Sequence, residues 1–200
     1  MAIRIGVIGL QGDVEEHVVA LNRALREMGV DGEAFWARKP ADLEGADGAV
    51  IPGGESTTIS KLLTRFDLRE VIRRMAREGR PILGTCAGLV LMAKEGDDQV
   101  QRTGTDLLSL MDMGVDRNAF GSQRESFETP VDIPGIGSYP GVFIRAPVIK
   151  RVWGSCEVLS RLEGRIVLAR QGNMIAAAFH PELTEDSRFY HLFISLFRRV

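Results

Sequence analysis

Residues 3–29, IRIGVIGLQGDVEEHVVALNRALREMG, predict the unit from which the fold is built. The β-branched run at residues 3–9 is typical of a buried strand, and Gly12 and Asp13 follow it as a turn. The next apolar residues repeat at the helical spacings of four and three: Val14, Val18, Leu21, Leu25 and Met28. Asp13 suits the N-terminus of this helix, and Gly29 suits the position just past its C-terminus. The stretch therefore indicates a strand, a turn and an amphipathic helix.

The same alternation continues through the first half of the chain. Strands are predicted at residues 33–36, 48–51 and 81–83, and helices from residue 57, over 68–78 and over 89–94. Strands that alternate with helices form parallel pairs joined by crossover helices. The first half therefore predicts an open, mostly parallel α/β sheet with helices on both faces.

The second half has a different pattern. Short apolar runs lie around residue 131 and at 142–144, 157–159, 166–169 and 175–179, with Gly, Pro or Ser between them. They predict additional short strands, partly antiparallel. A final helix from about Asp186 is expected to pack on the sheet. Residues 95–106, EGDDQVQRTGTD, are mostly polar and predict a mobile loop.

Length and charge limit the classes of function. A chain of 200 residues has the usual size of one domain, so we expect a single domain over residues 1–200. The formal net charge of -2 gives no general attraction to nucleic acid or to an anionic membrane. The longest nearly apolar run, residues 81–93, is shorter than the roughly 20 residues of a membrane-spanning helix. The apolar N-terminal stretch has no cleavage pattern of a secretory signal, so we predict a cytoplasmic protein.

The motif Gly84-Thr85-Cys86-Ala87-Gly88 has the G-x-C-x-G form of a nucleophile elbow between a strand and a helix. Its glycines allow a strained backbone at Cys86, and the helix N-terminus favours the thiolate. A buried structural cysteine in a tight turn is the alternative, which the pentapeptide alone leaves open. Cys156 has no such surroundings and is interpreted as structural. Two cysteines and three scattered histidines indicate no disulfide framework and no metal cluster.

A cysteine nucleophile needs a general base and a group that orients the base. His180-Pro181-Glu182 follows the apolar run at 175–179. In extended backbone, His180 and Glu182 point the same way, so the carboxylate can hold one ring nitrogen while the other faces Cys86. Taken alone, such a string is more often a turn histidine with a solvated glutamate. Together with Cys86, it indicates a catalytic triad.

Acyl transfer also needs backbone donors for the developing oxyanion. Pro52-Gly53-Gly54-Glu55-Ser56 follows the strand at 48–51, at the sheet edge where Cys86 is expected. We predict an oxyanion hole formed by the Gly53/Gly54 peptide N–H and the amide of Ala87. An anion-binding or simple turn-forming glycine pair is the alternative for this loop.

With these motifs assembled, the chain resembles the class I glutamine amidotransferases and, more narrowly, the glutaminase subunits of two-protein pyridoxal 5'-phosphate synthases. The resemblance covers nearly the whole length. Besides the elbow and the His-Pro-Glu string, the motifs that carry it are Gly9-Leu10-Gln11-Gly12-Asp13, Pro52-Gly53-Gly54-Glu55-Ser56-Thr57-Thr58, Arg117-Asn118-Ala119-Phe120-Gly121 and Gly141-Val142-Phe143-Ile144-Arg145-Ala146-Pro147. Two departures are Ser122, where the family is expected to have an arginine, and the poorly matching region 96–116.

The resemblance implies a glutaminase with no metal and no organic cofactor. Cys86 attacks the side-chain amide of L-glutamine, His180 protonates the leaving ammonia, and Glu182 orients His180. The residues implied to contact glutamine are Gly54, Glu55, Ser56, Arg117, Ile144 and Arg145. An amino acid substrate needs a cation for its carboxylate and acceptors for its ammonium group, which this set supplies.

The resemblance also implies a protein partner, a separate synthase subunit that uses the ammonia to make pyridoxal 5'-phosphate. Gln11 and His17 fall where the family meets this partner. From its place beside Glu16 on the first helix, His17 is interpreted as a surface or capping histidine. We expect low activity of the chain alone and higher activity when the partner completes the oxyanion site. Two alternatives are a cysteine hydrolase or peptidase that does not use glutamine, and a non-catalytic partner-binding module.

Overall fold

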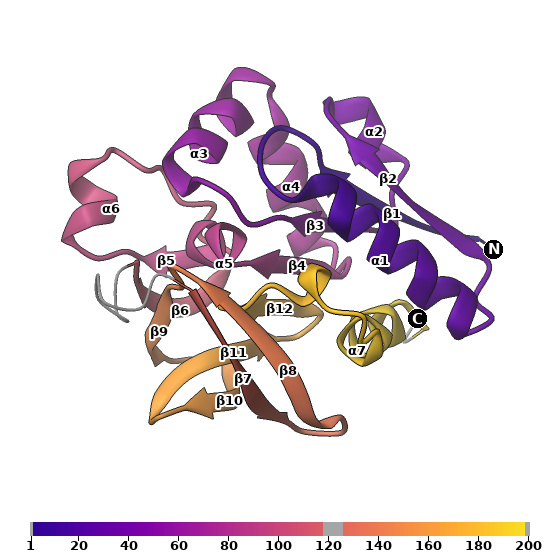
Figure 1. Ribbon diagram of the computed structural model, residues 1–200. Helices are drawn as coiled ribbons and strands as arrows, with labels where there is room; N and C mark the ends of the chain where they lie inside the picture. The colour runs from indigo at the N-terminus through magenta and orange to yellow at the C-terminus, as the bar shows by residue number, and fades with distance from the viewer. Residues whose placement is uncertain (1, 118–125, 199–200) are drawn as a thin grey trace.

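A computed structural model describes residues 2–117 and 126–198 (Figure 1). It begins with the predicted unit, in which strand β1 (Ile3–Ile8) is followed by helix α1 (Val14–Glu27) and strand β2 (Gly32–Ala37). β1 pairs in parallel with β2 on one side and with β3 (Gly48–Ile51) on the other. Leu21 and Leu25 of the predicted apolar stripe are buried, so the amphipathic helix is confirmed.

A mixed sheet forms the centre of the described fold. Its strand order is β2-β1-β3-β4-β12-β11-β9-β6-β5, and β10 pairs with β11. The strands that follow β3 in this sheet are β4 (Ile82–Thr85), β5 (Ala93–Glu95), β6 (Met111–Asp116), β9 (Val148–Val152), β10 (Glu157–Leu162), β11 (Arg165–Gln171) and β12 (Met174–Ala177). All pairs from β2 to β12 are parallel, whereas β11 is antiparallel to β12, β9 and β10. The predicted α/β sheet with additional antiparallel strands in the second half is confirmed.

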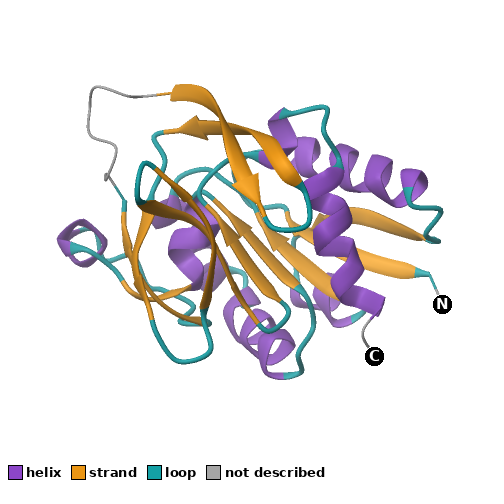
Figure 2. Cartoon of the chain, turned by 90° about the horizontal axis from the view of Figure 1, so that it is seen from below, coloured by secondary structure: helices purple, strands orange, loops and turns teal. Residues whose placement is uncertain are grey.

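Helices cover both faces of this sheet (Figure 2). On one face, α1 packs beside α7 (Arg188–Ile194), which continues as the 3-10 helix η2 (Ser195–Arg198). The other group is α2 (Pro40–Glu44), α3 (Ser56–Arg65), α4 (Leu68–Arg77) and α5 (Ala87–Met92). Right-handed crossovers explain this division, because β1 to β2 and β3 to β4 run in opposite directions along the sheet. None of the described helices is long and apolar enough to cross a membrane.

A separate antiparallel hairpin, β7 (Ser126–Ile133) and β8 (Gly137–Ile144), lies next to the residues that follow β12. The rings of Tyr139 and Phe143 contact that of Phe179, with centroid distances of 5.8 and 5.9 Å. The backbone N–H of His180 donates to the carbonyl oxygen of Val142 at 2.8 Å. The hairpin therefore brings its last residues close to His180.

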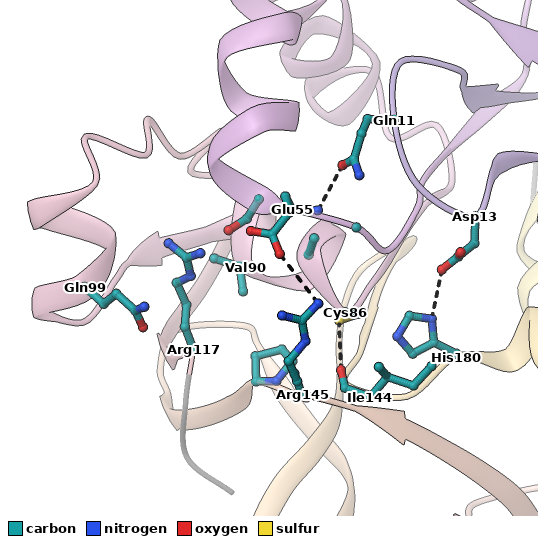
Figure 3. A pocket seen from close by; sticks show the side chains of 14 residues that line it. Gln11, Asp13, Glu55, Cys86, Val90, Gln99, Arg117, Ile144, Arg145 and His180 are labelled. Atoms are coloured by element: carbon teal, nitrogen blue, oxygen red, sulfur yellow. Dashed lines mark hydrogen bonds and ion pairs between the residues drawn. The ribbon is translucent and has the colours of Figure 1, made fainter. Parts of the chain in front are cut away.

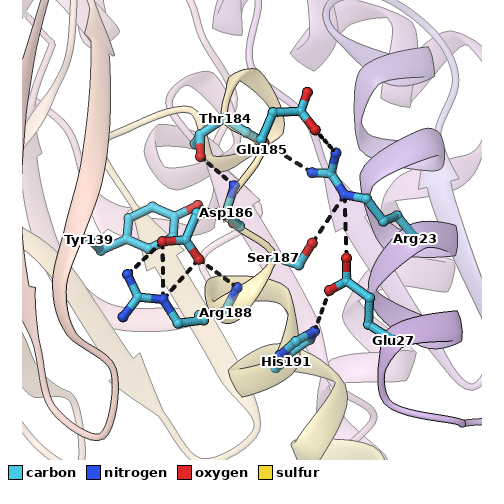
Figure 4. Close-up of polar contacts among 9 residues, drawn as sticks. All are labelled: Arg23, Glu27, Tyr139, Thr184, Glu185, Asp186, Ser187, Arg188 and His191. Carbon is cyan, nitrogen blue, oxygen red and sulfur yellow. Dashed lines mark hydrogen bonds and ion pairs between the residues drawn. The ribbon is translucent and has the colours of Figure 1, made fainter.

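The segment after β12 is anchored from several elements (Figure 4). It begins with the 3-10 helix η1 (Pro181–Leu183) and leads into α7. Arg23 of α1 donates to the hydroxyl of Ser187 at 3.1 Å. Arg188 forms an ion pair with Asp186 at 2.6 Å and donates to the carbonyl oxygen of Ser138 in β8. These contacts hold the segment that carries Glu182 between α1 and the hairpin.

Three local predictions differ from the structure. The helix predicted over 89–94 ends at Met92, where the chain becomes β5. The predicted loop at 95–106 contains helix α6 (Asp98–Arg102), because Asp97 Oδ1 accepts a hydrogen bond from the backbone N–H of Val100 and caps the first turn. Strands β6 and β9 have no counterpart among the predicted strands, because Asp, Gly, Lys and Arg interrupt their apolar runs.

Candidate active site

Cys86 lies between β4 and α5, at the expected strand-to-helix turn. Its backbone dihedrals are φ 48° and ψ -104°, a strained conformation for a residue with a side chain. Glycine is needed at position 88, because a Cβ there would lie 2.0 Å from the carbonyl oxygen of Ile51. Helix α5 therefore packs directly against β3, and the motif has the geometry of a nucleophile elbow.

Parallel pairing of β4 with β12 brings Cys86 and His180 together (Figure 3). Thr85 and Ala177 are partners in register, and the N–H of Cys86 donates to the carbonyl oxygen of Ala177 at 2.8 Å. Cys86 and His180 line the same pocket. The Sγ of Cys86 lies 3.9 Å from the carbonyl oxygen of Ile144. The predicted nucleophile and base are therefore neighbours at one edge of the sheet.

Two carboxylates face Nδ1 of His180. Glu182 Oε1 lies at 2.6 Å and Asp13 Oδ2 at 3.4 Å. Burial by itself lowers the pKa of His180, but its interactions with Asp13, Cys86 and Glu182 outweigh burial and raise the pKa to about 12. His180 is therefore an imidazolium at neutral pH. Its buried Nε2 makes no hydrogen bond of ordinary geometry among the described residues, although Cys86 is near enough to contribute to the raised pKa.

Asp13 lies at the N-terminus of α1, the position that the sequence predicted. Asp13 stands directly before the helix, but its carboxylate makes no hydrogen bond to the helix N-terminus. It turns to His180 instead, and this hydrogen bond lowers the pKa of Asp13. A charged imidazolium is a stronger partner for a carboxylate than a neutral backbone N–H. The sequence carries no signal for this contact, because Asp13 and His180 come from opposite ends of the chain.

The interpretation of His17 as a surface or capping histidine is wrong. Its side chain has no exposed surface, and its ring contacts the hydroxyls of Thr85 at 3.1 Å and Tyr190 at 2.9 Å. The structure contradicts the expected place of His17 in a partner interface, because a fully buried side chain cannot touch another protein. Helical spacing is a signal for this burial: His17 lies three residues after Val14 and four before Leu21, both in the apolar stripe.

A pocket of about 400 Å³ opens at Cys86 (Figure 3). The residues implied to contact glutamine all line it: Gly54, Glu55, Ser56, Arg117, Ile144 and Arg145. The volume is within the range of roughly 300–1,000 Å³ for small-molecule sites. The structure therefore gathers these six residues around one pocket next to Cys86.

The two arginines of the pocket are held differently. Arg145 has φ 41°, and its Nη2 lies 3.8 Å from Oε1 of Glu55, with both side chains exposed. The Nη1 of Arg117 donates to the hydroxyls of Thr57 at 3.4 Å and Thr103 at 3.2 Å. The pocket thus offers cations for a carboxylate and a carboxylate for an ammonium group. The rest of the Arg117 motif, residues 118–121, and Ser122 lie outside the described residues.

The predicted oxyanion donors surround Cys86 and His180. Ala87 begins α5 and lines the pocket, and Gly53 packs against the ring of His180, where a Cβ would lie 2.6 Å from Cε1. Gly54 has φ 141°, and a Cβ there would lie 2.5 Å from Oε1 of Gln11. The same Oε1 accepts a hydrogen bond from the backbone N–H of Glu55 at 2.9 Å. The Gln11 side chain therefore holds the glycine loop, a contact that the sequence pattern does not indicate.

The ligand-type atoms of Asp13, His180 and Glu182 lie within 4.8 Å of one another, a spacing that is also found in metal sites. The hydrogen bond between Nδ1 of His180 and Oε1 of Glu182 already accounts for the closest of these contacts. The arrangement is therefore explained by the pairing of a histidine with its carboxylates.

Almost the whole sequence matches a known family. Residues 7–199 match the SNO glutamine amidotransferase family. The chain belongs to this family. Among its relatives are proteins from Archaeoglobus fulgidus and Methanosarcina mazei, each named pyridoxal 5'-phosphate synthase subunit PdxT. The Archaeoglobus fulgidus protein is 50% identical to this chain, and the match covers 97% of this chain and 98% of the relative. The Methanosarcina mazei protein is 53% identical, and the match covers 96% of this chain and 97% of the relative.

Solved structures agree with membership of the SNO glutamine amidotransferase family. One, described as "Crystal structure of glutamine amidotransferase", is 44% identical, with a TM-score of 0.86 over 97% of this chain and 98% of that one. PurLQS from Thermotoga maritima is 16% identical, with a TM-score of 0.63 over 99% of each chain, and shows the fold alone. The resemblance to glutamine amidotransferases stated from the sequence is confirmed.

Proposed function

We propose that this chain hydrolyses L-glutamine to L-glutamate and ammonia, and supplies the ammonia to a separate synthase subunit for the biosynthesis of pyridoxal 5'-phosphate, vitamin B6. The observation that carries the proposal is the placement of Cys86 and His180, with Glu182 bound to His180 from behind, at a pocket with charged groups for both ends of an amino acid. The names of the relatives, pyridoxal 5'-phosphate synthase subunit PdxT, support the destination of the ammonia.

The first half-reaction releases ammonia. The thiolate of Cys86 adds to the side-chain carbonyl carbon of glutamine, and the electron pair of the C=O bond moves to oxygen. The Gly53/Gly54 peptide and the amide of Ala87 donate to this oxyanion. The carbon–nitrogen bond then breaks, nitrogen takes the proton of Nε2 of His180, and ammonia leaves a thioester on Cys86.

The second half-reaction restores the enzyme. His180, now neutral, takes a proton from water as the water oxygen adds to the thioester carbon. The carbon–sulfur bond breaks and its electron pair stays on Sγ of Cys86, while His180 keeps the proton taken from water. The product leaves as the carboxylic acid and gives its remaining proton to solvent, which makes it glutamate. Glu182 holds Nδ1 of His180 throughout and stabilises the charged ring.

The partner surface is proposed around the start of α1. Gln11 lines the pocket and binds the Glu55 amide, so a protein docked on Gln11 would act directly on the glycine loop that donates to the oxyanion. Val19 of α1 and Leu183 of η1 are large apolar side chains with 55% and 43% of their surface exposed. Exposed apolar side chains of this kind suit a protein interface.

We further propose that residues 1–200 act as one glutaminase domain. One cluster of buried apolar residues, from Ile5 in β1 to Leu196 in η2, joins the two halves of the described chain and supports this. A cytoplasmic location stays a prediction.

Glutamine hydrolysis measured with and without the synthase subunit tests the proposal. We expect a low rate for the chain alone and a higher rate with the partner, because the partner completes the oxyanion site. Equal rates would contradict the gating by the partner. No hydrolysis under either condition would contradict the glutaminase assignment, and turnover of thioesters or peptides without glutamine would favour a cysteine hydrolase. Failure of a glutamine-like diazoketone to label Cys86 would favour a non-catalytic binding module.

A further inference from the structure

A buried polar cluster lies behind the triad, on the side of Glu182 that faces away from His180. His17 of α1 is at its centre, with Nδ1 2.9 Å from the hydroxyl of Tyr190 in α7. Its Nε2 lies 3.1 Å from Oγ1 of Thr85 in β4 and 3.4 Å from Oε2 of Glu182. His17, Thr85 and Tyr190 have no exposed surface. Three elements that are distant in the sequence therefore meet at the carboxylate that binds His180.

The protonation state of His17 follows from these contacts. Burial lowers the pKa of His17, although the nearby charges of Glu182, Asp13 and Glu16 oppose this, and His180 adds to it. His17 is therefore neutral and carries one N–H. Burial raises the pKa of Tyr190, so its hydroxyl keeps its proton.

The hydroxyl of Tyr190 has Nδ1 of His17 as its hydrogen-bond partner among the described residues. A phenol O–H that donates to Nδ1 leaves the single ring proton of His17 on Nε2. That N–H points toward Thr85 and Glu182.

Glu182 needs a donor on its second oxygen. Its side chain is fully buried, and while Oε1 binds His180, Oε2 has no hydrogen bond of ordinary geometry among the described residues. A buried carboxylate oxygen without a donor is costly, because it has lost its hydration. Nε2 of His17 lies 3.4 Å from this oxygen, which is within ion-pair distance although long for a hydrogen bond.

We propose that His17, held in its Nε2–H tautomer by Tyr190, is a positioning residue for Glu182. The N–H of His17 stabilises the ionised carboxylate and fixes its orientation, so that Oε1 keeps His180 directed at Cys86. His17 and Tyr190 transfer no proton in the reaction. The effect on turnover rests on the glutaminase function proposed above, whereas the effect on the orientation of His180 does not.

Four variants separate this role from a structural one. Tyr190→Phe removes only the hydroxyl, so the proton of His17 is no longer confined to Nε2. We expect kcat for glutamine to fall about tenfold, the lower end of the effect found for groups that orient metal-binding histidines. His17→Leu removes the donor and is expected to lower kcat further. His17→Gln places an amide N–H near the former Nε2 and should recover most of kcat. Leu21→Ala, on the same buried face of α1, is the control for lost packing and should leave kcat unchanged.

The measurements are kcat and KM for glutamine with the synthase subunit present, together with the NMR signal of the Nδ1 proton of His180. We expect KM to stay within about twofold, because no member of the cluster touches the pocket, and the Nδ1 signal to shift in Tyr190→Phe and His17→Leu. Circular dichroism identifies any variant that does not fold. If His17→Leu does not fold, the kcat values of Tyr190→Phe and His17→Gln decide between the two roles.

Four results would overturn the proposal. Two concern single variants: an unchanged kcat in folded Tyr190→Phe, or a kcat of His17→Gln no higher than that of His17→Leu. The other two are a fall in kcat in Leu21→Ala equal to that in Tyr190→Phe, and an Nδ1 signal of His180 that does not shift in any variant. If the wild-type protein does not hydrolyse glutamine, the proposed function fails. The NMR comparison then still decides whether His17 positions Glu182 and His180.

Discussion

The imidazole of His180 has an interior side and a pocket side, and the protein builds them differently. The interior side is formed by Glu182, His17 and Tyr190, which have no exposed side-chain surface or almost none. On the pocket side, 38% of the Asp13 side chain is exposed, and the Glu55–Arg145 ion pair beyond it is more exposed still. Water competes for partners on the pocket side and is excluded from the interior side. The interior side is therefore fixed before substrate binds, whereas pocket-side groups can exchange partners with a substrate.

Replacing Cys86, which lies beside His180 in the pocket, should have the largest effect on activity. Cys86→Ala removes the nucleophile, and we expect glutamine hydrolysis to fall by at least about 10⁴-fold. Cys156→Ala is the matched control, since this second buried cysteine has a pKa raised to about 11, first by burial, and lies outside the pocket lining. It should keep full activity in the same coupled glutamate assay. A Cys86→Ala protein that still turns over glutamine would refute the nucleophile assignment.

The interior side is tested by Glu182→Gln. This change keeps the size of the side chain but removes the charge that stabilises the imidazolium, so kcat should fall about 10²- to 10⁴-fold, as for other triad carboxylates. KM should change little, because Glu182 does not line the pocket. Steady-state kinetics measure both values. The comparison breaks down if Asp13→Asn lowers kcat as much as Glu182→Gln, since the exposed carboxylate would then be the one that orients His180.

The pocket side is tested by Arg145→Ala. The change removes a cation implied to bind the substrate, so we expect KM for glutamine to rise about tenfold while kcat stays within about threefold. Arg151→Ala is a control of equal charge: Arg151 is exposed and pairs with Glu95, away from the pocket. A loss in kcat without a change in KM would place Arg145 on the reacting groups and not on the substrate's charged ends.

The smallest effect is expected from the pH dependence of stability in Asp13→Asn. The pKa of Asp13 is lowered from 3.8 in the folded protein, chiefly by its hydrogen bond with His180. A lowered carboxyl pKa stabilises the fold above the ordinary pKa, and this contribution disappears as pH falls through the lowered value. The variant should be less stable than wild type at pH 7, by no more than about 1 kcal/mol because the carboxylate is partly exposed. The difference should begin to shrink below about pH 4 and should vanish only below the lowered pKa of Asp13.

Urea unfolding of both proteins from pH 3 to pH 8 measures this difference. A difference that does not change with pH would mean that Asp13 stabilises the fold through packing and not through its charge. Such a result would also remove Asp13 from the account of the raised pKa of His180.

Sequence alone was enough for features whose residues are close together along the chain. The apolar stripe of α1, the elbow around Cys86 and the pair His180 and Glu182 depend on helical period, on a five-residue turn and on an i, i+2 spacing. The parallel order of the strands follows from the alternation of strand and helix. Local geometry fixes these features, so a pattern is sufficient to predict them.

Only the tertiary structure decided what these features face. Helical period places His17 on the buried face of α1, but it carries no information about the meeting with Tyr190 and Glu182, which depends on how α1, α7 and η1 pack. Two other contacts likewise join residues that are far apart in the sequence. Asp13 contacts His180, and the side chain of Gln11 accepts a hydrogen bond from the backbone N–H of Glu55. A pattern predicts burial because burial depends on one element, whereas a contact depends on the packing of two.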